Sequence, residues 1–264
     1  YLLAGTYNLR PSMSVQEIAD ALTQGRIATD LVTISPGIRL DQVRQILIQK
    51  YGFGASEVDA ALNPANYANH PALVDKPKGA SLEGYLYPES FQKTGETSPQ
   101  TIIRQSLDEM QKVLTPELRA GIVRQGLTVH QGVILASIIE QEVSNPDDKK
   151  TVAQVFIKRL KEDIRLESDA TATYGAVLSG QIDSLSRQQV LAFDSDYNTY
   201  TNDGLTPTPI SNVGIRSLQA VANPSDTSYL YFVSGDDGKT YFSSTIEEHE
   251  ALVRQHCTKL CSAQ

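Results

Sequence analysis

One strongly apolar segment, Thr128–Val143 (TVHQGVILASIIEQEV), constrains the fold of this chain more than any other stretch. Thr128, with Gln131 three residues later, has the pattern of a capping box, which predicts that a helix begins there and fixes its phase. The segment carries a carboxylate, Glu140, beside isoleucines. Because an ionised carboxylate in apolar surroundings is costly, the pKa of such a group usually rises. A carboxyl group that holds its proton near neutral pH can act as a general acid, and the alternative is a partly exposed residue near a helix end.

A second carboxylate, Glu142, follows two residues later. Two residues apart on a helix means about 200° apart around its axis, so the two carboxylates cannot both address one bond. We expect one of them to face a cleft and the other to face a structural partner, such as an arginine. The spacing alone leaves open which is which.

Composition narrows the class of protein. The chain has 264 residues, 40% of them hydrophobic and 20% charged, which is typical of a globular protein with one or two domains. A formal net charge of −8, with no cluster of Lys and Arg to offset it, argues against nucleic-acid binding. The sequence contains no run of about 18 apolar residues, so it predicts no membrane span. The first residue is not Met, and Tyr1–Tyr7 has the pattern of an interior strand, so we expect a truncated chain.

The first 77 residues predict a small β-α-β-α module. Its strands are expected at Tyr1–Tyr7 and Leu31–Ile34, and its helices follow Ser14 and Leu40 and end at Gly25 and Gly52. Lys76–Gly79 is the best candidate for a linker to the rest of the chain.

Residues 78–264 predict a larger mixed α/β domain, so the expected fold class is α+β. Helical patterns cover about 98–114, 116–125, 129–143, 148–161 and 185–191. Residues 194–214 are rich in Tyr, Asn, Thr, Pro and Gly and predict an ordered loop. Tyr229–Val233 and Thr240–Ser243 flank Gly-Asp-Asp-Gly, a hairpin signal, and a final helix is expected from Ser244 or Thr245 to about His256.

Several loop residues combine aromatic faces with amide, hydroxyl and carboxyl groups, a mixture that suits sugars. Each could equally be a packed loop residue, and Ser168 or Asp169 could simply cap a short helix. These candidates for substrate binding are Glu83, Tyr85, Ser168, Asp169, Tyr197, Asn198 and Tyr200.

Other catalytic signals are absent from the sequence. It has no GxSxG, HExxH, P-loop or GxGxxG motif, and its four histidines lack metal-ligand spacing, so no metal and no cofactor is expected. Cys257 and Cys261 could pair, stay free or bind a metal weakly with His256, and a peripheral pair without a catalytic part is the favoured interpretation.

Taken together, these motifs resemble one family, the YceG-like (MltG-type) endolytic murein transglycosylases. The similarity lies in LEGYLYP, LASIIEQE, VFIKRL with RLESD, YNTYTNDG, PTPI, and YLYFV with YFSSTIEEH, in this order between residues 82 and 249. The N-terminal AGTYNLRPSMSVQEI is similar to the LysM-like region of the family, which implies a LysM-like module over residues 1–77 and a catalytic domain over residues 78–264. The family commonly has Lys at the position of Gln141, and Gln-Thr-Asp-Pro where this chain has Glu167–Ala170.

The resemblance implies a specific reaction. Members cleave the β-1,4 bond between N-acetylmuramic acid and N-acetylglucosamine within peptidoglycan strands and leave 1,6-anhydro-muramyl ends. Glu140 matches the catalytic glutamate, acting as the single general acid and base, and the seven candidates above are expected to line the sugar subsites. The resemblance also implies peptidoglycan strands and wall-synthesis enzymes such as penicillin-binding proteins as partners. It implies a location outside the cytoplasm, on a membrane anchor that this chain lacks.

Two alternatives stay open. The first is a lysozyme-like hydrolase that uses Glu140 with a water molecule and a second carboxylate, Asp169 or Glu83. The second is a peptidoglycan-binding scaffold without catalytic activity, in which Glu140 is structural.

Overall fold

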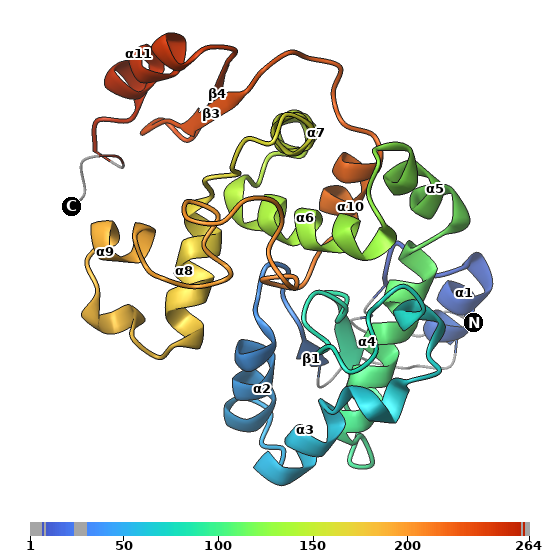
Figure 1. Cartoon of the computed structure of the whole chain (residues 1–264). Coiled ribbons are helices and arrows are strands. Elements are labelled where there is room, and N and C mark those ends of the chain that lie inside the picture. The colour runs from blue at the N-terminus through green and yellow to red at the C-terminus, as the bar shows by residue number, and fades with distance from the viewer. Residues whose placement is uncertain (1–6, 8, 24–30, 260, 262–264) are drawn as a thin grey trace.

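Figure 1 shows the computed structural model of this chain, which describes residue 7, residues 9–23, residues 31–259 and residue 261. The predicted first strand lies outside these residues except for Tyr7, and so does the predicted helix end at Gly25. Helices and small antiparallel sheets alternate along the chain, which confirms the α+β class.

The N-terminal half supplies the helices and the strand pair in the lower part of Figure 1. Its elements are α1 (Val15–Thr23), β1 (Leu31–Thr33), α2 (Leu40–Gln49), α3 (Ala55–Ala61), the 3₁₀ turns η1 (Pro64–Tyr67) and η2 (Pro71–Leu73), β2 (Ser90–Gln92) and α4 (Pro99–Val113). The predicted cap of α1 is confirmed: the Glu17 backbone N–H donates to Ser14 Oγ at 3.2 Å.

Strand β1 pairs antiparallel with β2, which the sequence analysis did not predict, with Val32 opposite Phe91. Both side chains are fully buried, in one hydrophobic core whose members run from Val32 to Ala222. The predicted 1–77 module therefore shares its sheet and its core with later residues. Its LysM-like character and the boundary at residue 77 stay predictions.

Helix α6 (Val129–Glu142) occupies the centre of the other half, between α5 (Pro116–Arg124), α7 (Pro146–Lys161), α8 (Asp169–Leu178) and α10 (Ile215–Ala222) (Figure 1). Its predicted capping box is present, since the Gln131 backbone N–H donates to Thr128 Oγ1 at 3.1 Å. Every residue from Gly132 to Ile139 is buried, as expected for a helix that is apolar on all sides. The first and the last turn of α6 reach the surface of the core, and the last turn carries both carboxylates.

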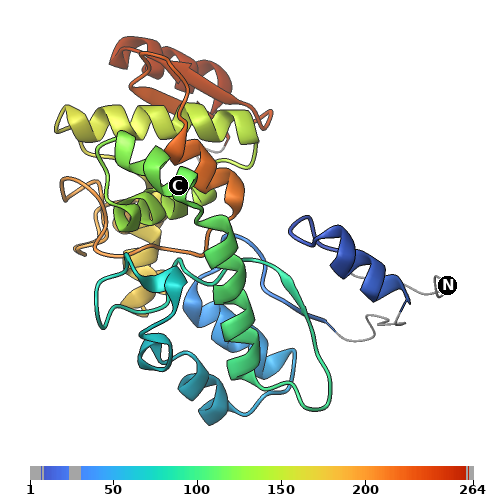
Figure 2. The same ribbon diagram turned by 90° about the vertical axis from the view of Figure 1, so that its right-hand side faces the viewer.

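The predicted C-terminal hairpin and helix are confirmed. Strands β3 (Tyr231–Ser234) and β4 (Thr240–Ser243) pair antiparallel, with Phe232 opposite Phe242, and α11 (Ile246–His256) packs on them. Between α8 and the hairpin the chain forms the 3₁₀ turn η3 (Ile182–Ser184), α9 (Arg187–Leu191) and the predicted long loop, which ends at α10. Viewed from the side, the hairpin and α11 lie across α7, on the opposite side of the molecule from α2 and α3 (Figure 2).

Among the described residues, no single helix has both the length and the hydropathy needed to cross a membrane; α5 and α6 meet that criterion only as a pair, with an 84° bend between them.

Candidate functional site

Glu142, the last residue of α6, lies where two cavities meet. The helix ends here because Val143 is extended, with φ −143° and ψ 142°, and Pro146 then opens α7. The two cavities have Glu142 and Asp169 in common, so these two carboxylates stand at their junction. Glu142 therefore fits the prediction that one carboxylate of α6 faces a cleft.

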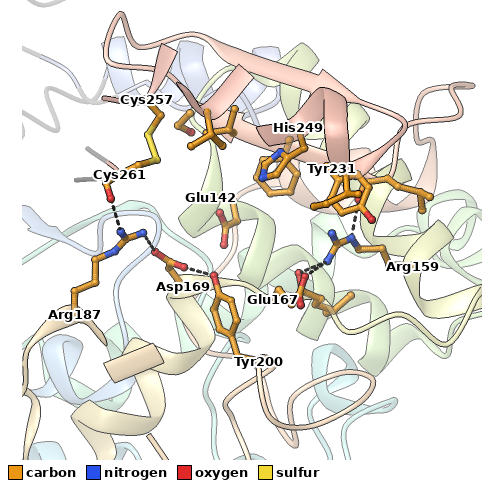
Figure 3. Close-up of a pocket in the computed structure, with 17 residues that line it drawn as sticks. Glu142, Arg159, Glu167, Asp169, Arg187, Tyr200, Tyr231, His249, Cys257 and Cys261 are labelled. Carbon is orange, nitrogen blue, oxygen red and sulfur yellow. Dashed lines mark hydrogen bonds and ion pairs between the residues drawn. A yellow bond between two sulfur atoms is a disulfide. The ribbon is translucent and has the colours of Figure 1, made fainter. Parts of the chain in front are cut away.

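The hairpin-side cavity, of about 580 Å³, lies below the hairpin and α11 (Figure 3). Glu142 points into it from the back, and Tyr200 and Asp169 form its floor. Its remaining polar lining comes from Arg159, Glu167, Arg187, Tyr231 and His249, and its apolar lining includes Leu230, Val233, Ile246 and Val253.

The α2-side cavity, of about 430 Å³, extends from the same junction toward the beginning of α2. It is lined by Gly37, Ile38, Arg39, Gln42, Gln141, Ala170, Thr173, Tyr174, Val177 and Ile210, in addition to the shared carboxylates. An open groove with space on both sides of one carboxylate can accept a polymer from either direction.

The environment of Glu142 raises the pKa of its carboxyl group to about 7. Burial is the main cause, and the negative charge of Asp169 adds to it, whereas the hydroxyl of Ser168 opposes it by donating a hydrogen bond to Glu142 Oε1. A carboxyl group with a pKa near 7 carries its proton for a large part of the time at neutral pH. Glu142 can therefore both give and take a proton there.

Ser168 holds Glu142 from a buried position at the start of α8. Its side chain makes no capping bond to α8, because the hydroxyl donates to Glu142 instead. The backbone N–H of Ser168 donates to Thr199 Oγ1 at 3.1 Å, and Thr199 shares a 2.8 Å hydrogen bond with Thr171. Ser168 is only 2% exposed and positions Glu142, and its contact with substrate stays a prediction.

Asp169 and Tyr200 line the hairpin-side cavity, and their contact with substrate stays a prediction. Tyr200 donates its hydroxyl to Asp169 Oδ1 at 2.5 Å, and Arg187 pairs with Asp169 Oδ2 at 2.8 Å (Figure 3). Burial and the adjacent Asp169 both raise the pKa of the Tyr200 hydroxyl, so this group stays a proton donor. The site thus contains Asp169, a carboxylate with fixed partners, beside Glu142, a carboxyl group with a pKa near 7.

Arg159, buried in α7, holds the loop before α8 against the hairpin. Its guanidinium donates to Leu230 O at 2.7 Å and to Arg165 O and Glu167 Oε2 at 2.8 and 2.9 Å. Glu167 adopts a φ of 53°, which is uncommon for a residue with a Cβ, and this contact helps to stabilise that conformation.

Glu140, the predicted catalytic residue, has a cation and two hydrogen-bond donors as partners, and its catalytic role stays a prediction. Lys149 Nζ pairs with Glu140 Oε1 at 2.9 Å, while the Ser217 hydroxyl and the Gly214 N–H donate to Oε2 at 2.5 and 3.2 Å. The cation is thus a lysine rather than the expected arginine. Glu140 lines neither of the two cavities that Glu142 lines. The helix phase predicted opposite faces correctly, and α7 and α10 bring Lys149 and Ser217 together on the Glu140 face.

Three other predicted substrate contacts prove to be buried. Tyr85 is fully buried and its hydroxyl pairs with His130 Nδ1 at 2.9 Å. Asn198 is fully buried and its amide donates to the backbone carbonyls of Leu191, at the end of α9, and Phe193. Glu83 is 5% exposed and accepts hydrogen bonds from the Leu40 N–H and the Tyr174 hydroxyl. The structure thus shows these three residues in contacts within the protein, and their part in substrate binding stays a prediction.

Tyr197 occupies an intermediate position. It packs its ring on Tyr174, with the centroids 4.8 Å apart, and shares a 2.8 Å hydrogen bond with Thr208 Oγ1. Tyr174 lines the α2-side cavity, so Tyr197 supports that wall from behind. The sequence analysis missed Arg187, Arg39 and Gln42 at the cavities, and no motif in the sequence signals them.

Cys257 and Cys261 form a disulfide at the edge of the hairpin-side cavity, with Cα atoms 5.3 Å apart. Of the three possibilities that the sequence left open, pairing is therefore the one observed.

Comparisons with known proteins agree with this architecture. The chain is 31% identical to an endolytic murein transglycosylase of Bacillus subtilis over 93% of its own length and 71% of that protein. It is 32% identical to an endolytic murein transglycosylase of Streptococcus pneumoniae, where it covers 97% of its own length but about half (51%) of the relative. A crystal structure of a yceG-like protein from Listeria monocytogenes superposes with a TM-score of 0.72 at 33% identity, covering 95% of this chain and 85% of that one. A family model described as YceG-like matches residues 1–255, and the chain therefore belongs to the YceG-like family.

Proposed function

We propose that this protein is an endolytic lytic transglycosylase of peptidoglycan, with Glu142 as its general acid and base. The observation that carries the proposal is the position of Glu142 at the junction of two cavities, with a pKa raised to about 7. Space on both sides of the acid fits cleavage within a strand. The names of the relatives, endolytic murein transglycosylases, support the substrate and the class of reaction.

In the first step, protonated Glu142 donates its proton to the glycosidic oxygen between N-acetylmuramic acid and N-acetylglucosamine. The C1–O bond of the muramic acid breaks, and the N-acetylglucosamine side leaves with a free hydroxyl group. Ser168 already donates to Oε1 of Glu142, which leaves Oε2 to exchange the proton.

In the second step, the Glu142 carboxylate accepts the proton of the C6 hydroxyl of the same muramic acid, and the C6 oxygen bonds to C1. The product is a 1,6-anhydro end, no water is consumed, and Glu142 is protonated again. Because the nucleophile belongs to the substrate, one carboxyl group is sufficient, in contrast to the carboxylate pair of a hydrolase.

A hydrolase is the second candidate, because Asp169 lies beside Glu142 and its side chain is 46% exposed. In that reaction Asp169 would activate a water molecule or stabilise the cationic intermediate. Glu83, the other carboxylate considered for this role, is buried behind Tyr174 and cannot reach a bound strand.

The test is digestion of purified peptidoglycan strands, with the products identified by mass spectrometry, since an anhydro end is lighter by one water. We expect internal fragments with anhydro ends from the wild type. The Glu142→Gln variant should lose about 10²- to 10⁴-fold in rate, the usual contribution of a general acid. Glu140→Gln is the matched control on the same helix and should retain the activity of whatever fraction is folded.

Reducing ends from the wild type would establish the hydrolase. Full activity of Glu142→Gln together with a folded but inactive Glu140→Gln would restore the assignment made from the sequence. Equal fragment release by wild type and both variants would favour a binding scaffold.

The same proposal places this domain outside the cytoplasm, where peptidoglycan lies. A membrane anchor and association with wall-synthesis enzymes such as penicillin-binding proteins stay predictions from the family resemblance.

A further inference from the structure

We propose that the α2-side cavity is a subsite for an N-acetylated sugar. Gln42, from the N-terminal part of the chain, donates a hydrogen bond to the acetamido group of that sugar. This inference deepens the proposed function and rests on it for the class of ligand. It assigns binding residues to a region that the sequence predicted to be a separate module.

Hydrogen bonds of Asn212 fix the wall that carries Gln42 to the C-terminal half of the chain. Asn212, 2% exposed, accepts from the Ile38 N–H at 3.0 Å and donates from its amide to Ser35 O at 2.9 Å. Its own N–H donates to Ile38 O, also at 2.9 Å. These bonds hold the loop before α2 in one position relative to the loop before α10.

Two further bonds fix the same loop close to Glu142. Gln141, the neighbour of Glu142 in sequence, donates to Gly37 O at 2.6 Å. Glu83 accepts from the N–H of Leu40, at the first turn of α2, and from the hydroxyl of Tyr174, which lies on α8 across the cavity. Glu83 is therefore a positioning residue for both walls of this cavity.

Apart from the shared carboxylates Glu142 and Asp169, the lining of the cavity suits an uncharged amide ligand. Ile38, Val177 and Ile210 offer apolar surface for the methyl group of an acetamide, and Tyr174 lies beside them. The guanidinium of Arg39 is paired with Asp41 through two bonds of 2.9 Å, so it offers no unpaired charge.

Gln42 has a free donor at this wall. Its Oε1 accepts from the Arg39 N–H at 2.9 Å, as the third helical residue of a capping box does. Within residues 31–259 its Nε2 makes no hydrogen bond, so this amide N–H is available to a carbonyl oxygen in the cavity. Thr173, exposed on the facing wall, supplies a hydroxyl within the same space.

The test uses Gln42→Glu, which keeps the capping oxygen and removes the N–H donor. Gln131→Glu is the matched control, because Gln131 occupies the same position in the capping box of α6 and lines neither cavity. Binding of an N-acetylglucosamine tetramer is measured by titration calorimetry in the Glu142→Gln background, so that the readout does not depend on turnover. The deacetylated glucosamine tetramer is the comparison ligand.

We expect the acetylated tetramer to bind at least 10-fold more tightly than the deacetylated one. Gln42→Glu should reduce the affinity for the acetylated tetramer about 10-fold, the effect of one lost hydrogen bond of about 1.4 kcal/mol. Thr173→Val should cost severalfold and Gln131→Glu nothing.

Equal losses in Gln42→Glu and Gln131→Glu, or equal or tighter binding of the deacetylated tetramer, would overturn the proposal. So would the absence of tetramer binding in a Glu142→Gln protein that is shown to be folded. None of these results depends on the product analysis that tests the enzymatic function, so the two proposals can fail separately.

Discussion

Replacing Lys149 with methionine should strongly destabilise this protein. The Lys149 side chain is 5% exposed and that of its partner Glu140 is 11% exposed, so the substitution leaves a carboxylate in the core without its cation. Breaking a buried ion pair by removing one partner costs about 3–5 kcal/mol, whereas an exposed pair contributes about 0–1 kcal/mol. Since methionine has a similar length and fits an apolar environment, the loss reports on the charge rather than on a cavity.

The assay is thermal unfolding combined with a double-mutant cycle. For a chain of this size, 3–5 kcal/mol corresponds to a drop in Tm of about 6–20 °C. Lys149→Met with Glu140→Gln should be less destabilised than the sum of the single variants, because the second change removes the orphaned charge. A loss below about 1 kcal/mol for Lys149→Met, or strict additivity in the cycle, would refute the reasoning.

Three further predictions concern protons. Cleavage should slow as pH rises through about 7, because Glu142 must be protonated to act as the acid, and a pH–rate profile checks this. Ser168→Ala should move this alkaline limb to higher pH while lowering the maximal rate, because the Ser168 hydroxyl lowers the Glu142 pKa; an unmoved limb would argue against the contact. Burial raises the pKa of Glu83 to about 7. This shift contributes about 3 kcal/mol to the free energy of unfolding below pH ~4.5, and the contribution is lost as pH rises through ~7. Glu83→Gln should therefore flatten the decline in stability over that range, measured by urea unfolding, and an unchanged slope would contradict the shift.

Local patterns predicted much of this fold. The capping boxes at Ser14 and Thr128 and the Gly-Asp-Asp-Gly turn depend on residues close in sequence, and each is present in the structure. Strand β2 and helix α10 were missed. β2 has three residues, too few for a periodic pattern, and it is specified by pairing with β1 across 56 intervening residues.

The candidate site was predicted only in part, for a related reason. Helical geometry separated Glu140 from Glu142, but the partners of Glu140 lie in α7 and α10, and no local pattern in the sequence indicates them. Aromatic and amide residues in the loop indicated a polar site correctly at Tyr200. At Asn198 the same chemistry holds the loop to the backbone at the end of α9, and no local pattern distinguishes these two uses.

The hydrogen bonds of Asn212 have a consequence for folding kinetics. Its bonds to Ile38 and Ser35 close loops of 174 and 177 residues, and contacts of such long range form slowly because chain entropy opposes them. During synthesis the loop before α2 emerges long before its partner does. We therefore expect the groove to assemble among the last steps of folding, so that a nascent chain has no complete groove until its second half is made. Late protection of the Ile38 amide in pulsed hydrogen exchange would report this order directly.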